Sequence, residues 1–151
     1  MKVSAGILLF RRVADGLKIL LVHPGGPFFK NKDDGAWTIP KGEAAPDEDL
    51  LARAKIEFAE ELGVEPVGEP VALGFVKQKG GKIVHAWALE GDFSGPPRSN
   101  TFDLEWPPRS GRVQSFPEID RAEFFPLELA RAKINAAQRE FLDRLAERLH
   151  L

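Results

Sequence analysis

Short apolar runs separated by turn-forming residues recur along this chain. Asp15-Gly16 separates the first two runs and Gly80-Gly81 the next two, so each pair of runs predicts a β-hairpin. The near-continuous apolar character of the first pair indicates strands that are covered on both faces. The segments expected to be strands are 3–11, 18–23, 71–77, 82–89 and 121–126.

Apolar residues at intervals of three and four predict helices elsewhere. One central helix ends at Gly63, and two more are expected over 127–133 and 134–149. The apolar stripe of the central helix consists of Leu51, Ala54, Phe58 and Leu62. Residues 24–35 read as a loop, and 91–117 read as a long irregular stretch. This order favours an α/β fold with a mixed sheet between helical layers.

Length and composition indicate an ordinary globular protein. The 151 residues are expected to form a single domain, 1–151, that buries roughly 68–70% of its unfolded surface. The formal net charge of -2 gives no bulk electrostatic sign of nucleic-acid or membrane binding. The absence of cysteine excludes disulfides and thiolate chemistry and fits a reducing cytoplasm. The N-terminal apolar run is too short to span a membrane, so a cytoplasmic protein is expected.

Glu57, Glu60 and Glu61 lie on one face of the expected central helix, within about one turn. Like charges at this spacing destabilise a helix by roughly 0.2–0.5 kcal/mol per pair, and acids near the C-terminal end of the helix dipole add to that cost. A hard divalent cation reverses the sign of the interaction, because Mg²⁺ and Mn²⁺ prefer oxygen ligands. The three acids therefore indicate either a metal site or a solvated acidic face.

The spacing of these acids resembles the signature of the Nudix hydrolases, Gly-x5-Glu-x7-Arg-Glu-U-x-Glu-Glu-x-Gly-U, where U is a bulky aliphatic residue. The residues in register are Gly42, Glu48, Glu57, Phe58, Glu60, Glu61, Gly63 and Val64. The resemblance implies a Nudix-like α/β/α sandwich and metal-dependent hydrolysis of a diphosphate linkage. It implies Mg²⁺ (or Mn²⁺) held by Glu57, Glu60, Glu61 and the Gly42 carbonyl, with one of these carboxylates also accepting the proton of the attacking water.

Phe58 stands in for the usual aliphatic residue of the signature, and one other position departs from it more seriously. Ile56 stands where the family has arginine, and it cannot make the charged hydrogen bonds that, by resemblance, would brace the acids. Lys55 points about 100° away from that position on a helix and is a poor replacement. Arg53 lies four residues before Glu57 on the acidic face, so it is a candidate brace; otherwise it is a solvated helix arginine.

Residues around the signature are candidates for binding the substrate. Lys41 would pair with a phosphate oxygen. Four aromatic residues are candidates for stacking on a nucleobase, which contributes roughly 1–3 kcal/mol per base: Trp37, Phe28, Phe29 and Trp106. Trp37 also reads as partly core. Glu105 and Glu118 are loop acids that would complete the metal shell or serve as base, or else are solvated.

The Trp-x-x-Pro-Lys-Gly segment over 37–42 resembles that of Nudix enzymes that act on dinucleoside polyphosphates. A small-molecule nucleotide substrate is therefore expected, either a nucleoside triphosphate or a dinucleoside polyphosphate, with sugar nucleotides second. No nucleic-acid or membrane partner is expected, and the chain would act as a monomer or homodimer. The alternative, which rests on Ile56, is a non-catalytic Nudix-fold module that binds a nucleotide or a protein. The three histidines, His23, His85 and His150, lack metal-ligand spacing and read as structural or exposed.

Overall fold

The computed structural model describes residues 2–151 as a mixed sheet with helices on both faces. The elements are β1 (Val3–Val13), β2 (Gly16–Pro24), β3 (Lys41–Glu43), α1 (Leu50–Leu62), β4 (Val71–Gln78), the 3-10 turn η1 (Lys79–Gly81), β5 (Lys82–Glu90), β6 (Thr101–Glu105), β7 (Val113–Pro117), β8 (Ile119–Pro126), α2 (Leu127–Lys133), the 3-10 turn η2 (Ala136–Gln138) and α3 (Arg139–Arg148). The expected α/β fold and both predicted hairpins are confirmed.

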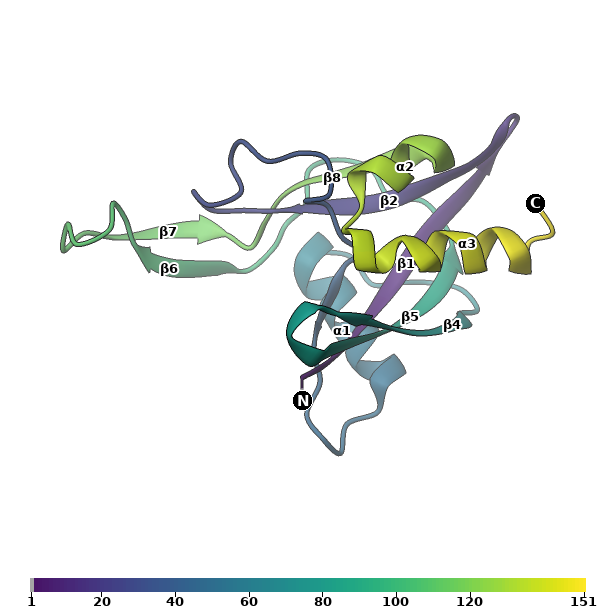
Figure 1. Cartoon of the computed structure of the whole chain (residues 1–151), viewed down its shortest axis with the longest axis horizontal. Coiled ribbons are helices and arrows are strands. Elements are labelled where there is room, and N and C mark those ends of the chain that lie inside the picture. Colours follow the sequence, from purple (N-terminus) through teal and green to yellow (C-terminus); the bar gives the residue numbers. More distant parts are fainter. Residues whose placement is uncertain (1) are drawn as a thin grey trace.

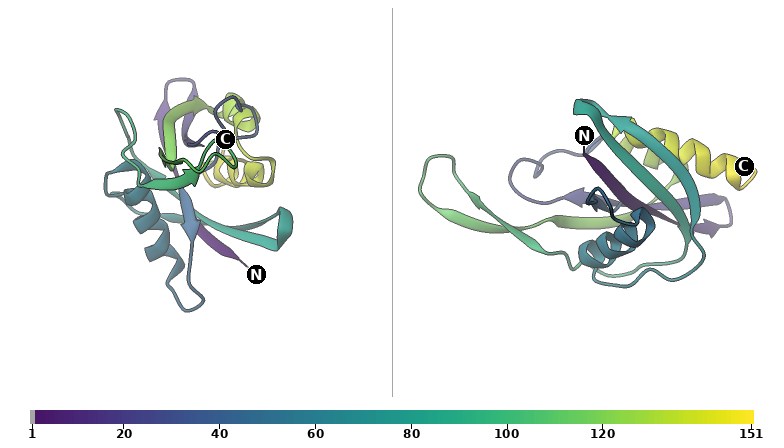
Figure 2. Two further views of the ribbon diagram at one scale, coloured as in Figure 1. Left: turned by 90° about the vertical axis from the view of Figure 1, so that its left-hand side faces the viewer. Right: turned by 90° about the horizontal axis from the view of Figure 1, so that it is seen from below.

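The main sheet has the strand order β4-β5-β1-β2-β8, and β3 adds a further pairing to β1. β1 and β5 run parallel, whereas the other pairings of this sheet are antiparallel. In Figure 1, α2 and α3 lie in front of the sheet and α1 lies behind it. The left view of Figure 2 shows the same arrangement from the side.

Two apolar clusters fill the space between the sheet and these helices. Leu8 and Phe10 of β1 belong to the cluster under α2 and α3, whereas Ile7 and Leu9 belong to the cluster under α1. Alternate residues of a strand point to opposite faces, so a strand buried on both sides must be apolar nearly throughout. The continuous apolar run near the N-terminus therefore has the structural cause that the sequence indicated.

The stretch 91–117 was expected to be irregular, but part of it forms regular strands. β6 and β7 pair into a separate two-stranded sheet, here called the arm, which projects from the body (Figure 1). Phe102 pairs with Phe116 inside the arm, and their ring centroids are 6.0 Å apart. Most arm side chains are exposed or only half-buried, so the strands carry too weak an apolar alternation to be recognised from sequence.

The predicted helix over 134–149 is interrupted at its start. Ile134 is extended, with φ -74° and ψ 148°, and the α-helix begins only at Arg139. The main chain of Trp37 explains the break, because its N–H donates to Lys133 and its carbonyl accepts from Asn135. Ile134 is still fully buried, which is why it continued the helical apolar period in the sequence.

Lys41 and Gly42 of the Trp-x-x-Pro-Lys-Gly segment belong to strand β3, which pairs with β1. Gly6 of β1 allows this approach, since a Cβ atom there would lie 2.5 Å from the carbonyl oxygen of Pro40 and 2.8 Å from the Cβ of Lys41. The pairing fixes Lys41 and Gly42 in the sheet directly before α1. Among residues 2–151, no helix is long and apolar enough to cross a membrane.

Candidate active site

Helix α1 begins and ends at well-formed caps. The side chain of Asp49 accepts a hydrogen bond from the N–H of Ala52 at 3.1 Å, which satisfies one of the free donors at the helix start. Gly63 ends the helix in the left-handed region, with φ 79°, and its N–H donates to the carbonyl of Ala59 at 2.8 Å. These two caps fix the length of α1 and so the positions of the acids within it.

The three acids of α1 differ in burial. Ala54, Phe58 and Leu62 pack into the core as predicted, whereas Leu50, and not the predicted Leu51, is the leucine that packs against this cluster. Glu61 lies beside them and is only 7% exposed, Glu57 is half-buried and Glu60 is exposed. The acidic face therefore runs from the rim of the core out to solvent, so its members have different electrostatic environments.

The carboxylate of Glu57 lies directly over Gly42. A Cβ atom at position 42 would be 1.8 Å from Oε1 of Glu57, so no larger residue fits there while Glu57 keeps this position. Burial raises the pKa of Glu57 above its ordinary value, and the charges of Glu60 and Glu118 add to the increase, whereas Arg53 opposes it. The signature glycine thus brings β3 main chain against a carboxylate of the helix.

Glu61 has the most strongly shifted pKa of the acids on α1. Burial raises the pKa of its carboxyl to about 9, with further increases from Glu57 and Glu118, although Lys41 opposes the shift. Its carboxylate also accepts a hydrogen bond from the backbone N–H of Lys41. Burial likewise lowers the pKa of the Lys41 ammonium, against the opposing charge of Glu61. Desolvation thus outweighs attraction for both groups, and Glu61 holds a proton at neutral pH in the metal-free protein.

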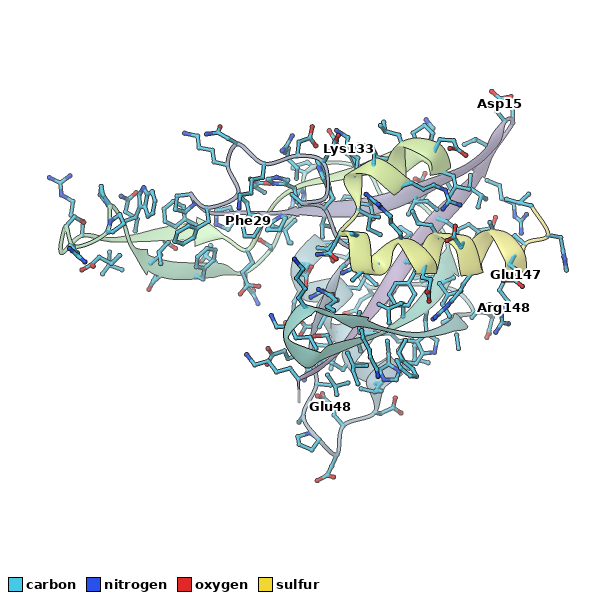
Figure 3. The ribbon with its side chains drawn as sticks, in the orientation of Figure 1. Asp15, Phe29, Glu48, Lys133, Glu147 and Arg148 are labelled. Atoms are coloured by element: carbon cyan, nitrogen blue, oxygen red, sulfur yellow. The ribbon has the colours of Figure 1, made fainter. Side chains whose placement is uncertain are left out.

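Arg53 connects the two signature acids that precede and follow it. Its Nη1 lies 3.0 Å from Oε2 of Glu57, and its Nη2 lies 2.6 Å from Oε2 of Glu48. Glu48, labelled in Figure 3 in the loop before α1, also accepts from the N–H of Ala45 at 2.9 Å. The Glu48 and Glu57 carboxylates together raise the pKa of the Arg53 guanidinium. Arg53 therefore occupies the bracing position that the sequence suggested for it, while Ile56 is 42% exposed.

The structure separates two loop acids that the sequence could not rank. Glu118 lies between β7 and β8, and its charge raises the pKa of both Glu57 and Glu61. Its backbone N–H donates to Asn100, and its carbonyl accepts from Gly25. Glu105 instead lies at the end of β6 next to the turn of the arm, where its Oε1 accepts from the N–H of Arg109 at 3.1 Å. Only Glu118 of this pair acts on the helix acids.

Trp37 lies in the core and not at a binding surface. It is 1% exposed, and its indole N–H donates to Asp33 at 2.8 Å. His23 and Phe125 pack edge-on against it, with ring centroids 5.1 Å and 4.9 Å away. No face of Trp37 is therefore open to a nucleobase, which corrects the expectation that this residue contacts substrate.

The other aromatic candidates lie along the arm. Phe28 is 59% exposed and meets Trp106 edge-on, with centroids 5.4 Å apart. Phe29 lies on the same loop, beside the arm (Figure 3). Of the histidines, His23 is buried, with its ring nitrogens 2.8 Å from Asp120 and 2.7 Å from the Lys32 carbonyl oxygen, which agrees with its structural interpretation.

The acids fit a hard cation in chemistry, although they are not gathered around one point. Within residues 2–151, no three histidine, cysteine, aspartate or glutamate side chains converge closely enough to hold a metal ion. Glu60 and Glu61 nevertheless make no ion pair in the described part of the chain, and the charges of Glu57 and Glu118 act on buried Glu61. Oxygen donors with this mutual repulsion suit Mg²⁺ or Mn²⁺.

A family model described as the NUDIX domain matches residues 1–145. The chain therefore belongs to the NUDIX family, as the signature over 42–64 suggested. It has the α/β fold of that family.

Solved structures share this fold at low sequence identity. An Ap4A hydrolase from C. elegans, solved as a binary complex, is 22% identical, with a TM-score of 0.65 over 97% of this chain and 98% of the other. The NUDIX domain of NrtR from Shewanella oneidensis, complexed with ADP ribose, is 18% identical, with a TM-score of 0.64 over 97% and 87%. A MutT protein from Methanosarcina mazei Go1 is 22% identical, with a TM-score of 0.61 over 99% and 96%. No curated protein sequence matches the chain.

Proposed function

We propose that the protein is a metal-dependent pyrophosphohydrolase that cleaves a diphosphate linkage in a nucleotide, either a nucleoside triphosphate or a dinucleoside polyphosphate. The observation that carries this proposal is the group of carboxylates around Gly42. Glu57 lies over this glycine, buried Glu61 holds a raised pKa, and Glu118 acts on both. Family membership and the Ap4A hydrolase named above support the substrate class, because that neighbour is matched over nearly its full length.

Glu57, Glu60, Glu61 and the Gly42 carbonyl are the ligands proposed for Mg²⁺ or Mn²⁺. A bound divalent cation supplies neutralisation of phosphate charge and activation of a water molecule. Arg53 holds the Glu57 carboxylate between itself and the backbone of β3, so that this ligand keeps its orientation. Since ligands must be deprotonated to bind metal, Glu61 would have to release its proton in order to serve as a ligand.

The chain's own residues then serve the displacement at phosphorus. The oxygen of water attacks one phosphorus, the bridging P–O bond breaks, and the other phosphate leaves with the bridging oxygen. We assign acceptance of the water proton to Glu118, because it lies outside the helix acids and is fixed by backbone hydrogen bonds on both sides. Lys41 supplies a positive charge next to Glu61, where it would pair with a phosphate oxygen.

A non-catalytic binding module is the second candidate that the sequence left open. Its support was Ile56 in place of the family arginine. The ion pair between Arg53 and Glu57 offsets that support, because it provides a guanidinium for the acidic face from one turn earlier. Retention of all three helix acids also favours catalysis, because a site that binds no cation gains nothing from their repulsion. We place the reaction in the cytoplasm, which the absence of cysteine supports.

Turnover of a substrate panel tests the proposal. Purified protein is incubated with nucleoside triphosphates, dinucleoside polyphosphates and sugar nucleotides at millimolar Mg²⁺ or Mn²⁺, and products are separated by ion-exchange chromatography. Release of a nucleoside monophosphate that chelator abolishes is the expected result. Tight nucleotide binding without metal-dependent turnover of any panel member would favour the binding module instead.

A further inference from the structure

The main sheet ends at β4 on one side and at β8 on the other, and the two edges differ. An edge strand presents unpaired main-chain groups to other chains, and proteins protect such edges with bulges, charged side chains or a covering element. The register of β4 shifts at a bulge after Ala72, and the carbonyl oxygens of Leu73 and Phe75 accept hydrogen bonds from Arg144 of α3 at 2.8 Å and 2.9 Å. The β4 edge is therefore covered.

β8 has protection of this kind only at its two ends. At the start, Oγ of Ser99 accepts from the N–H of Ile119 at 3.1 Å, and the register with β2 skips Asp120. At the other end, Pro126 lacks an N–H. Within residues 2–151, the main chain of 120–125 pairs with no strand other than β2 and bonds no other element. This stretch is therefore an open edge.

The pairing of β2 shows which main-chain groups of β8 point outward. The N–H and the carbonyl of Val22 exchange hydrogen bonds with Thr38, at 2.9 Å and 3.0 Å. Since both groups of Val22 point to that side, its pair with Ala122 of β8 is of the non-hydrogen-bonded kind. The N–H and carbonyl of Ala122 accordingly point away from β2, as do those of Phe124 two residues further on. A strand that approaches this edge meets free donors and acceptors.

Two copies of the chain can pair at this edge only in restricted registers. They are related by a two-fold axis perpendicular to the joined sheet, so each face of the sheet is kept. Residues directly opposite each other share a face and neighbours alternate between faces, so some residue must lie opposite its own copy. A centre at Asp120, Arg121 or Glu123 places like charges opposite each other, which is destabilising. Ala122 and the two phenylalanines of β8 remain as centres.

Proline and charge favour Ala122 among these centres. A centre at either phenylalanine sets an outward carbonyl opposite Pro126, which has no N–H to donate. A centre at Ala122 places Arg121 of each copy opposite Glu123 of the other. Because the main-chain groups of Ala122 point outward, the two Ala122 residues form a hydrogen-bonded pair. The flanking pairs are then of the non-hydrogen-bonded kind, in which side chains lie closer, so two cross-strand ion pairs result.

Both charged side chains are available for these pairs. Arg121 has 48% of its side chain exposed, and its Nε lies 3.9 Å from Oδ1 of Asp120, at the outer limit of an ion pair. Its guanidinium also lies 4.9 Å from the centre of the Trp37 ring, which holds the arginine against the sheet. Glu123 is exposed and forms no ion pair within the described residues. The edge thus carries one weakly paired cation and one unpaired anion.

We propose that two copies of the chain join through β8 in antiparallel pairing centred on Ala122, so that their main sheets form one continuous sheet. The Ala122 residues exchange two main-chain hydrogen bonds, and Arg121 pairs with Glu123 on either side. The joined strands are no longer edges, so the dimer closes the open stretch of β8 as Arg144 covers β4. This inference is independent of the proposed function, because the acids of α1 take no part in it.

Charge exchange tests the pairing. Sedimentation equilibrium of the full chain over a range of concentrations gives the dissociation constant of the dimer. In Arg121→Glu and in Glu123→Arg, that constant should rise by about tenfold or more, because each change turns two attractions into two repulsions. The double variant, Arg121→Glu with Glu123→Arg, should restore the dimer, since the pairs form again with the signs exchanged. Glu69→Arg, at an exposed glutamate outside β8, is the matched control and should dimerise like the wild type.

Three outcomes of this experiment would overturn the inference. The first is a wild-type protein that remains monomeric at every concentration. The second is a dimer that both single variants retain. The third is a double variant that stays monomeric although its circular dichroism spectrum matches that of the wild type.

Single cysteines test the register, because the chain has none of its own. The Cα atoms of a hydrogen-bonded pair lie about 5.5 Å apart, within the range that a disulfide bridges. In oxidised glutathione, Ala122→Cys should form a disulfide-linked dimer, whereas Ala14→Cys, at the exposed turn between β1 and β2, should cross-link far more slowly. Equal cross-linking of the two variants would refute pairing at Ala122, whether or not the protein hydrolyses nucleotides.

Discussion

The acidic face of α1 and the basic tip of the β4–β5 hairpin are two concentrations of like charge that the protein handles in opposite ways. On α1 the charges extend into the core, so that burial and mutual repulsion raise the pKa values of Glu57 and Glu61. At the tip, Lys77, Lys79 and Lys82 are exposed, and water screens their charges. Buried charge is sensitive to small changes in geometry, whereas exposed charge is not.

This difference predicts how each region contributes to function. A carboxylate held in one position in a poorly solvated site acts strongly on a bound cation and on reacting atoms, because the local dielectric is low. An exposed ammonium acts on affinity and selectivity with a smaller effect per residue. Substitutions on α1 should therefore change the rate of the reaction, and substitutions at the tip should have smaller effects.

The largest effect is expected for Glu61→Gln. This change removes the most buried charge of the site with little change in side-chain size, so kcat should fall by at least about 10²–10³-fold, the scale for loss of one electrostatic stabiliser. Steady-state kinetics at saturating Mg²⁺ checks the value. Glu65→Gln, at an exposed glutamate just beyond α1, is the matched control and should leave kcat unchanged. Full turnover by Glu61→Gln would place the metal site elsewhere.

Glu118→Gln and Glu105→Gln form the next test, because the two loop glutamates differ only in their position relative to α1. Loss of a general base lowers kcat by roughly 10²-fold or more, so this effect is expected for Glu118→Gln. Glu105→Gln should retain the wild-type rate, since Glu105 contacts the turn of the arm. Equal rates for the two variants would remove Glu118 from the mechanism.

A smaller effect is expected for Arg53→Ala. Loss of a group that orients a metal ligand typically costs roughly 10–100-fold, and here the ligand is Glu57. The measurement is the Mg²⁺ concentration that gives half-maximal activity, together with kcat. Lys55→Ala on the opposite side of the helix should change stability by no more than about 0.5 kcal/mol and leave metal affinity intact.

Ile56→Arg complements that test, because it restores the family residue one turn before Glu60. Ile56 is 42% exposed, so the guanidinium can reach solvent and the variant should fold. It should affect activity less than Arg53→Ala does. A fully active Arg53→Ala protein would show that Glu57 needs no brace, while leaving the hydrolase assignment in place.

A separate effect is expected on stability without metal. The pKa of Glu61 is about 9 in the folded protein, against an ordinary value of 4.5. The folded state therefore keeps this proton where the unfolded state loses it, so the contribution of Glu61 is fully present below pH 4.5 and is lost as pH rises towards 9. In chelator, the Tm of the wild type should fall across this range relative to Glu61→Gln. Parallel Tm curves for the two proteins would contradict the raised pKa.

Local features of this molecule could be predicted from sequence. The apolar stripe and acidic face of α1 depend on residues three and four apart, so spacing alone placed Glu57, Glu60, Glu61 and Arg53 on one side. The buried strands β1 and β2 could also be predicted from sequence, because strands covered on both faces need nearly continuous apolar residues.

Features set by distant parts of the chain could not be predicted. Trp37 was a candidate for stacking because nothing nearby in sequence shows that His23 and Phe125 enclose it. Glu105 and Glu118 could not be distinguished as loop acids in the sequence. In the structure, Glu105 lies in the arm, whereas the charge of Glu118 acts on Glu61 of α1.

The parallel pairing of β1 with β5 makes assembly of the site a late event in folding. Val3 pairs with Ile83, so β3 and α1 both lie within the long connection that this pairing closes. Contacts of high sequence separation form slowly, because loop-closure entropy must be overcome before they become favourable. Helix α1 can form early from local contacts with its acids already on one side, but the sheet that carries Lys41 gains its parallel pairing only when β5 docks. Catalytic competence should therefore lag behind helix formation during refolding.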